Sequence, residues 1–225
     1  MNTLAIETSG KMLGLALAQD GKIKAEFFGE AGHTHSERLL PELGKLLRKA
    51  KWNLRDLDKV AVSVGPGSFT GIRIGLVCAR VLAQELKIPL VGIDALSILE
   101  AGVPACGALV APAIDALRDE VYVRGQHGIE IQSAEKFFKA LAKRKGKVVV
   151  AGNATAVFAD MLNKLKLNSA GPEFIYPRAG TLALLAEKLR GEKYDKVLPV
   201  YVRKSWAEEN KNKNRRDAKS CVSTR

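Results

Sequence analysis

Several features that mark membrane or secreted proteins are missing from this sequence. No apolar run approaches the roughly 20 residues that a membrane-spanning helix needs. The first residues, Met1–Leu4, carry neither the basic region nor the long apolar stretch of a secretory signal peptide. We therefore expect a cytoplasmic protein that is not bound to a membrane.

Cysteine and histidine, two residues typical of metal centres, are scarce. The three cysteines, Cys78, Cys106 and Cys221, are far apart and match no paired metal-ligand spacing, so we expect reduced thiols. The three histidines include no pair at i and i+4, the spacing that places two imidazoles on one helix face. His33 and His35 are two residues apart and would diverge on a helix. The sequence therefore predicts no metal site.

A catalytic nucleophile is also missing. Ser68 follows a tight turn, but the nucleophile pattern G-x-S-x-G is only loosely met, because Pro66–Thr70 reads P-G-S-F-T. No His–Asp partner can be assigned to this serine. We expect Ser68 to cap a helix, and we predict no catalytic residue.

Acidic residues are outnumbered by basic ones, and the net charge is +12. Residues 203–225 hold eight basic and three acidic residues, so this tail contributes +5. A basic surface favours RNA or another anionic partner, and it also favours plain solubility. Both interpretations stay open. After Trp206 the chain is strongly polar, and we expect little order there.

The hydrophobic pattern predicts an α/β protein in which strands and helices alternate twice. A capping box at Thr34–Glu37 opens a helix that ends near Ala50. In the first half we expect strands 4–6, 13–18, 23–28, 60–64 and 90–93, with a second helix at 70–86. In the second half we expect strands 108–114, 121–124, 147–151 and 198–202, a helix at 134–143 capped by Ser133, a helix ending near 165, and another at 181–190.

This repeated order predicts two α/β lobes with mixed sheets flanked by helices. The expected N-terminal lobe covers residues 1–104 and the C-terminal lobe residues 105–205. A basic tail, residues 206–225, follows them.

The most informative stretch is Gly65–Gly75, which reads GPGSFTGIRIG and follows an apolar run. It predicts a buried strand, a glycine-rich turn and a helix start, where Ser68 or Thr70 caps the helix and free N–H groups can bind an anion. Gly71, Gly75, Ala79 and Ala83 lie four residues apart and form one stripe on that helix. Such a stripe fits either a docking face for a partner helix or close packing on the chain's own sheet.

These motifs resemble those of the TsaB-type (YeaZ) family of tRNA threonylcarbamoyladenosine synthesis. The glycine-rich stretch is the most specific match, and the resemblance runs from about residue 2 to about residue 209. Further matching stretches are Leu4–Ser9, His35–Pro41, Asp115-Ala116, Glu120–Tyr122 and Tyr201–Ser205. One departure is Leu117, where the family commonly has a basic residue, so an anion contact there is in doubt.

The resemblance implies an actin-like fold of the ribonuclease H-like type and a role without catalysis. It implies a heterodimer with the catalytic TsaD-type paralogue, recruitment of the TsaE-type ATPase, and action on adenosine 37 of tRNAs that read codons starting with A. ATP and metal are then expected on the partner subunits, and the chain needs no cofactor of its own. tRNA would bind through the complex.

The partner interface expected from this resemblance lies on helices 36–48 and 70–86. We assign to it His35, Leu39, Leu43, Gly71, Ile72, Gly75, Ala79 and Ala83. Without the paralogue the same face would be a bare apolar patch, so we also expect a homodimer of the isolated chain.

The alternative function is a stand-alone ATPase or phosphotransferase that uses the cleft between the lobes. In actin-type enzymes, short turns after strands hold the phosphates. The residues that would form a weak nucleotide or anion site here are Glu7, Thr8, Ser9, Gly67, Ser68 and Gly152. Turns of this composition are also common without any ligand.

Overall fold

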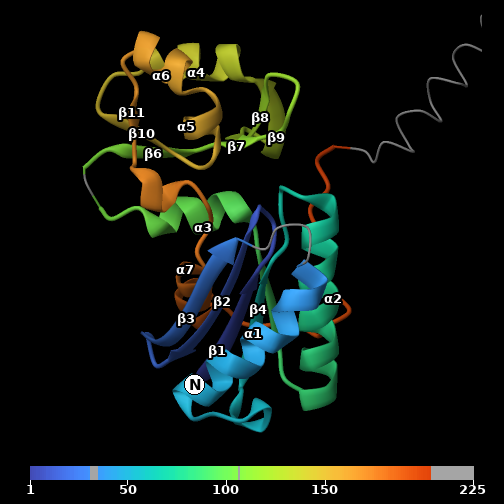
Figure 1. Ribbon diagram of the computed structural model, residues 1–225. Helices are drawn as coiled ribbons and strands as arrows, with labels where there is room; N and C mark the ends of the chain where they lie inside the picture. Colours follow the sequence, from blue (N-terminus) through green and yellow to red (C-terminus); the bar gives the residue numbers. More distant parts are fainter. Residues whose placement is uncertain (31–34, 106, 204–225) are drawn as a thin grey trace, which may run out of the picture.

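The computed structural model describes residues 1–30, 35–105 and 107–203. The chain forms a large lobe, drawn below in Figure 1, and a small lobe above it. The large lobe is built on one five-stranded sheet with the strand order β3-β2-β1-β4-β5. Its strands are β1 (Asn2–Glu7), β2 (Met12–Gln19), β3 (Lys22–Glu30), β4 (Lys59–Ser63) and β5 (Leu90–Ile93).

This sheet is mixed in direction. β1, β2 and β3 pair antiparallel, whereas β1, β4 and β5 pair parallel. The parallel half requires helical crossovers between its strands, and α1 (His35–Ala50) and α2 (Phe69–Leu86) provide them. This topology confirms the predicted mixed-sheet α/β fold with a ribonuclease H-like first lobe.

The two faces of the large sheet bury different side chains. On β1, Leu4 and Ile6 point toward α1 and α2, whereas Ala5 points to the opposite face, as the two-residue period of a strand requires. That opposite face is lined by small residues and is covered by α7 (Ala179–Glu187). The small side chains allow α7 to lie close against the sheet.

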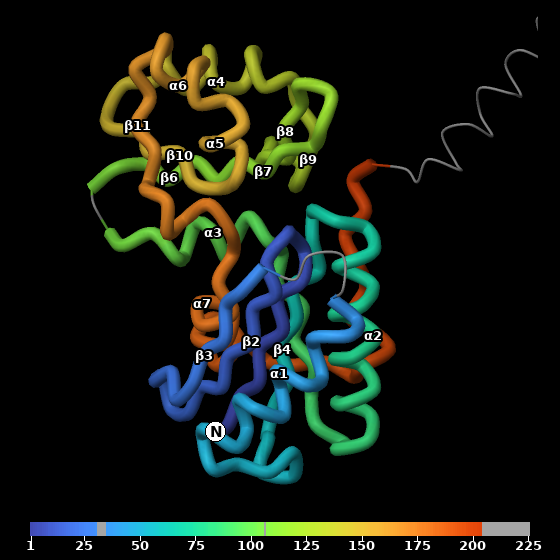
Figure 2. The backbone as a smooth tube through the Cα atoms, viewed as in Figure 1, coloured from blue at the N-terminus to red at the C-terminus, as the bar shows by residue number. Residues whose placement is uncertain are grey.

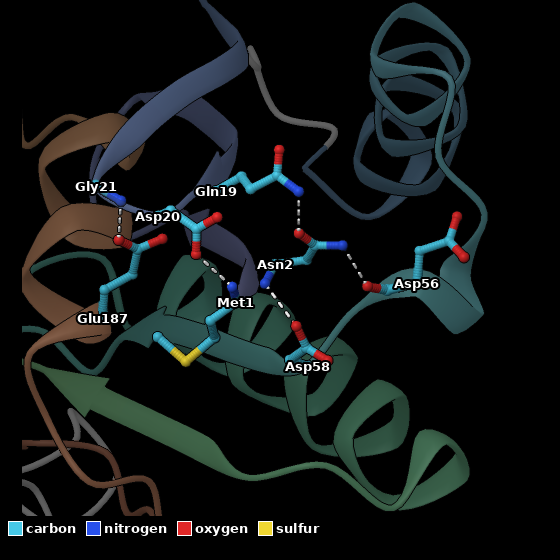
Figure 3. Close-up of polar contacts among 8 residues, drawn as sticks. All are labelled: Met1, Asn2, Gln19, Asp20, Gly21, Asp56, Asp58 and Glu187. Atoms are coloured by element: carbon cyan, nitrogen blue, oxygen red, sulfur yellow. Dashed lines mark hydrogen bonds and ion pairs between the residues drawn. The ribbon is translucent and has the colours of Figure 1, made fainter.

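The start of β1 is fixed by a set of polar contacts (Figure 3). The amino group of Met1 lies 2.6 Å from Oδ1 of Asp20, and the Asn2 amide donates to Asp58 at 2.7 Å. The Gly21 amide, in the turn between β2 and β3, donates to Glu187 at the end of α7 at 2.5 Å. The Asn2 side chain also donates to the Asp56 carbonyl at 2.7 Å, so these contacts join the lower end of the sheet to α7 and to the short 3-10 helix Leu54–Asp56.

The small lobe contains two three-stranded sheets and three helices. One sheet has the order β11-β10-β6 and the other the order β7-β8-β9. Phe138 of α4 is fully buried at the centre of its core. The strands are β6 (Leu109–Pro112), β7 (Ile114–Asp115), β8 (Glu120–Gly125), β9 (Gly128–Ser133), β10 (Val148–Ala151) and β11 (Asn168–Ser169). The helices are α4 (Ala134–Ala142), α5 (Ala154–Val157), α6 (Ala159–Lys164) and the 3-10 turn Pro172–Phe174.

Helix α3 (Ala95–Gly102) connects the lobes and is not among the predicted helices. Asp94 caps it by accepting a hydrogen bond from the Ser97 amide at 2.9 Å. Leu96 and Leu99 pack against small-lobe residues such as Tyr122, while Ile98 packs against the large sheet. The sequence signal was the Asp-Ala-Leu-Ser start, which is a typical helix cap.

The predicted C-terminal lobe, residues 105–205, is wrong at its end. Ala179, Leu182 and Ala183 of α7 pack against β1 and β2 of the large lobe. The Val200 amide donates to the Val64 carbonyl, also in the large lobe, at 2.8 Å. The small lobe therefore ends near residue 175, because the chain returns to cover the second face of the large sheet.

Two smaller expectations also differ from the structure. Residues 198–202 form no strand. Ser133 precedes α4, but its side chain makes no capping hydrogen bond. Thr34 of the expected capping box, His33, Cys106 and the tail 206–225 lie outside the described residues.

Candidate functional site

The glycine-rich turn between β4 and α2 packs backbone against backbone. Gly65 and Gly67 have φ angles of 94° and 152°, which side chains rarely tolerate. A Cβ atom on Gly67 would overlap the carbonyl oxygen of Ser9, and the Ser68 amide donates to that oxygen at 2.7 Å. The Ser68 hydroxyl caps α2 by accepting from the Gly71 amide at 3.2 Å, as predicted. The turn thus fastens α2 to the end of β1.

The small-residue stripe of α2 lies against the chain's own sheet. A Cβ on Gly71 would overlap the Thr8 carbonyl oxygen, and one on Gly75 would overlap the Thr8 hydroxyl. Thr8 Oγ1 also donates to the Gly71 carbonyl at 2.8 Å. Ala79 and Ala83 are at most 1% exposed. Of the two interpretations of the stripe, close packing on the sheet is the correct one.

The residue set assigned to a partner interface is therefore wrong. All eight are buried within the chain, so a partner cannot contact their side chains directly. They are His35, Leu39, Leu43, Gly71, Ile72, Gly75, Ala79 and Ala83.

The same two helices nevertheless carry an exposed apolar surface. α1 and α2 lie side by side on one side of the sheet (Figure 2). Val77 and Val81 on the outer side of α2 are 59% and 53% exposed, and Leu40 on α1 is 59% exposed. We call Leu40, Val77 and Val81 the outer face. The outer face was not predicted, although Val77 and Val81 are also four residues apart, because glycine and alanine form the more conspicuous stripe.

A cavity of about 850 Å³ lies where the two lobes meet. The turn after β1 and the start of α2 form its large-lobe wall, and the loop after β7 forms its small-lobe wall. Cationic side chains from both lobes line it, and so do two carboxylates. These charged residues are Lys11, Glu30, Asp115, Arg118 and Arg203.

The small-lobe wall has an unusual backbone. Leu117, Arg118 and Asp119 are three consecutive residues with φ angles between 55° and 62°. Asp115 holds the loop, because its carboxylate accepts from the Leu117 amide at 3.0 Å and its own amide donates to Asn153 at 2.8 Å. Leu117, which departs from the family pattern, is 70% exposed at this wall. The loop thus presents an apolar side chain to the cavity.

The residues predicted to bind a nucleotide divide into two groups. Ser9, Gly67 and Ser68 line the cavity. Glu7, Thr8 and Gly152 do not, and this part of the prediction is wrong. A Cβ on Gly152 would overlap the Ala113 carbonyl oxygen, and the Gly152 amide donates to Phe174 at 2.8 Å.

Glu7 is a buried carboxyl group below the cavity. Its Oε1 accepts from the amide and the hydroxyl of Ser9, each at 2.6 Å, while Oε2 has no hydrogen-bond partner. Burial raises the pKa of Glu7, and the hydrogen bonds from Ser9 oppose this only in part. Because a cation binds the ionised carboxylate, a raised pKa makes Glu7 a weaker cation ligand.

His35 is the one predicted interface histidine in the described part of the chain. It is 8% exposed at the start of α1, and burial lowers its pKa.

Among residues 1–30, 35–105 and 107–203, no three His, Cys, Asp or Glu side chains gather into a group that could hold a metal ion. In the same ranges, no helix is long and apolar enough to cross a membrane.

Comparison with known proteins identifies the family. The model of the family described as TsaD, tRNA N6-adenosine threonylcarbamoyltransferase, matches residues 28–210. The tRNA threonylcarbamoyladenosine biosynthesis protein TsaB of Bacillus subtilis (strain 168) is 30% identical to the chain over 224 residues. This alignment covers 92% of the chain and 96% of that relative. The chain belongs to the TsaB family.

Two further relatives agree with this membership. The TsaB protein of Escherichia coli (strain K12) is 29% identical over 224 residues, covering 92% of this chain and 96% of that relative. The solved structure of YeaZ from Pseudomonas aeruginosa superimposes with a TM-score of 0.71 at 27% identity, over 89% of this chain and 99% of that one. The resemblance drawn from the sequence motifs is confirmed, and it extends over both lobes.

Proposed function

We propose that this protein is a subunit required to form threonylcarbamoyladenosine at position 37 of tRNAs that read codons starting with A. The observation that carries the proposal is membership of the TsaB family over nearly the whole chain, with matching folds in both lobes. Curated relatives are named for this biosynthesis. The protein would act in the cytoplasm, where its tRNA substrates are.

The outer face is our proposed contact with the catalytic TsaD-type paralogue. Leu40, Val77 and Val81 are more than half exposed on two adjacent helices, and a partner packed there would remove these apolar side chains from water. The matching family model bears the transferase's description and spans both helices, which supports a paralogue with equivalent helices. Two related helix pairs can then pack face to face around a pseudo-two-fold axis as a four-helix contact.

We further propose that the chain is not itself catalytic and holds no nucleotide. The support is local. The Gly152 amide, in the small-lobe turn of the predicted nucleotide site, and the Ser68 amide, at the start of α2, already donate to carbonyls of this chain. Burial raises the pKa of Glu7, which weakens this carboxyl group as a ligand for a metal ion that accompanies a nucleotide. ATP and metal would be supplied by the TsaD-type and TsaE-type partners.

Mass spectrometry of modified nucleosides in bulk tRNA tests this function. We expect depletion of the protein in its own host to remove threonylcarbamoyladenosine, and the intact gene to restore it. Modification that persists at its normal level after depletion would contradict the proposal. Other modified nucleosides in the same tRNA sample are the control, and their levels should not change.

Nucleotide binding in the cavity is the second candidate function. The cavity is large enough for a small ligand, and Lys11, Arg118 and Arg203 place cationic groups on walls that also carry the carboxylates of Glu30 and Asp115. Titration calorimetry of the isolated chain with Mg–ATP separates the candidates. Our account expects no binding heat at millimolar nucleotide, whereas saturable binding at micromolar nucleotide would favour the second candidate.

A further inference from the structure

Two segments of the small lobe bring basic side chains to one edge of its sheet. β10 and β11 run parallel, and Val149 pairs with Asn168. Two residues earlier, Lys147 and Lys166 therefore lie at the same edge, where both strands begin. The Lys147 carbonyl also accepts from the Leu109 amide at 2.9 Å, which places the start of β6 beside it. The register of the sheet thus joins residues that are distant in sequence.

The six basic residues at this edge are all exposed. We call them the basic edge: Lys143, Arg144, Lys145, Lys147, Lys164 and Lys166. Residues 143–152 and 161–172 contain no aspartate or glutamate. Within the described part of the chain, none of the six forms an ion pair, whereas Lys139, one turn earlier on α4, pairs with Glu135 at 2.6 Å. Asp160 and Glu173 flank the second of these stretches, so the six basic residues outnumber the nearby carboxylates and the basic edge keeps an excess of positive charge.

The basic side chains of this cluster repel one another, which costs free energy. A bound polyanion reduces that repulsion, and the counterions that it releases favour binding further. No aromatic residue lies in 143–152 or 161–172, so the edge offers no platform on which bases stack. We propose that the basic edge binds the phosphate backbone of RNA, without reading its sequence. Under the proposed function, on which this identification rests, the RNA is the tRNA held by the complex.

The position of the basic edge supports this proposal. It lies at the beginning of β10, whereas Asn153, just after the end of β10, lines the cavity. The four residues of β10 that separate the basic edge from the cavity span about 13 Å. α1 and α2, which carry the outer face, belong to the other lobe (Figure 1). An RNA can therefore contact the basic edge while a protein partner occupies the outer face.

The test compares two variants of equal charge. The edge variant carries Lys143→Gln, Lys145→Gln, Lys147→Gln and Lys166→Gln. The control variant carries four changes of exposed lysines that lie outside the small lobe, namely Lys22→Gln, Lys24→Gln, Lys49→Gln and Lys188→Gln. The association constant for unmodified tRNA is measured by fluorescence anisotropy over a range of KCl concentrations. Both the full-length chain and its complex with the catalytic paralogue are measured.

Each lost phosphate contact should reduce the slope of log K against log salt by about 0.7–0.9. We expect the edge variant to lose about 2 to 3 units of slope and to bind tRNA at least about tenfold more weakly at low salt. The control variant should stay close to the unchanged protein. Equal slopes for the two variants, or no tRNA binding by the unchanged complex, would overturn the proposal. So would an edge variant that keeps its tRNA affinity and loses only its binding to anionic phosphatidylserine vesicles.

The tail 206–225 is also basic, so both variants are repeated in a chain truncated after Ser205. The edge effect should persist there, and its disappearance would assign the RNA contact to the tail instead. The proposed function is tested by different readouts, namely the level of threonylcarbamoyladenosine and the binding of the paralogue, so its failure can be distinguished from failure of the RNA proposal. A chain with no effect on modification but with an edge-dependent salt slope would retain the RNA surface alone.

Discussion

The two sides of α2 use four-residue spacing for opposite purposes. On the inner side, Gly71 and Gly75 allow the helix backbone to touch Thr8 at the end of β1. On the outer side, Val77 and Val81 extend from the helix and are more than half exposed. Small residues here mark close packing inside the chain, whereas larger apolar residues mark the surface that is free to bind.

The largest expected effect is a loss of stability when a substitution disrupts the packing of the inner side of α2. Gly75→Ala places a Cβ against the Thr8 hydroxyl, so α2 must move away from β1. We expect destabilisation on the order of 2–3 kcal/mol, measured by urea unfolding. The matched control is Gly44→Ala in α1, where a Cβ meets only the flexible end of Arg48 at 3.6 Å. Because alanine favours helix over glycine, the control should gain about 0.5–1 kcal/mol. Equal effects of the two changes would refute close packing at Gly75.

A second effect concerns the outer side in the isolated chain, which we expect to form a homodimer through the outer face. The double variant Val77→Asp and Val81→Asp places two charges on that surface, and the dimer dissociation constant should rise by at least about 100-fold. Sedimentation analysis at micromolar concentration measures it. Neither side chain lies in the core, so the stability of the monomer should change by less than about 1 kcal/mol. A chain that is already monomeric before substitution would argue against the homodimer.

The smallest expected effect concerns Glu7, at the end of β1, and the change of stability with pH. The folded state raises the pKa of Glu7, so it binds the proton more tightly than the unfolded state does. Stability should therefore fall as pH rises from the usual Glu pKa of 4.5 through the raised folded value. Glu7→Gln keeps the acceptor for Ser9 and provides a donor near Ser63, so it should stabilise the chain by about 1 kcal/mol at neutral pH.

The pH dependence distinguishes this cause from a general change in packing. The gain from Glu7→Gln should be small at pH 4 and should grow toward pH 8, as followed by thermal unfolding in matched buffers. A gain that is constant across this range would show that folding leaves the pKa of Glu7 unchanged, and it would contradict this prediction.

The spacing of apolar residues was sufficient to predict the strands of the large sheet together with α1 and α2, and the glycine-rich turn before α2 was sufficient to predict the capping role of Ser68. The sequence also contained the family resemblance, because the glycine-rich stretch is long and specific. The end of the small lobe was not predictable in this way. Ala179, Leu182 and Ala183 show that α7 is apolar, but nothing local states which sheet they cover.

The interface residues failed for a related physical reason. A small-residue stripe shows that two backbones approach closely, but the sequence does not say whether the second backbone belongs to the same chain. The second backbone is that of this chain, because the hydroxyl and carbonyl of Thr8 fill the space beside Gly71 and Gly75. The basic edge depends in the same way on strand register, since Lys147 and Lys166 become neighbours only when β10 and β11 pair.

The central claim is that the outer side of α2, and not its inner stripe, binds the catalytic paralogue. The most direct measurement is the affinity of that paralogue for the Val77→Asp and Val81→Asp chain, beside a Val157→Asp control. Val157 lies on α5 of the small lobe and is 56% exposed, a match for Val77. We predict that the double variant loses at least about 100-fold in affinity while the control binds normally. Undiminished binding by the folded double variant would contradict the account.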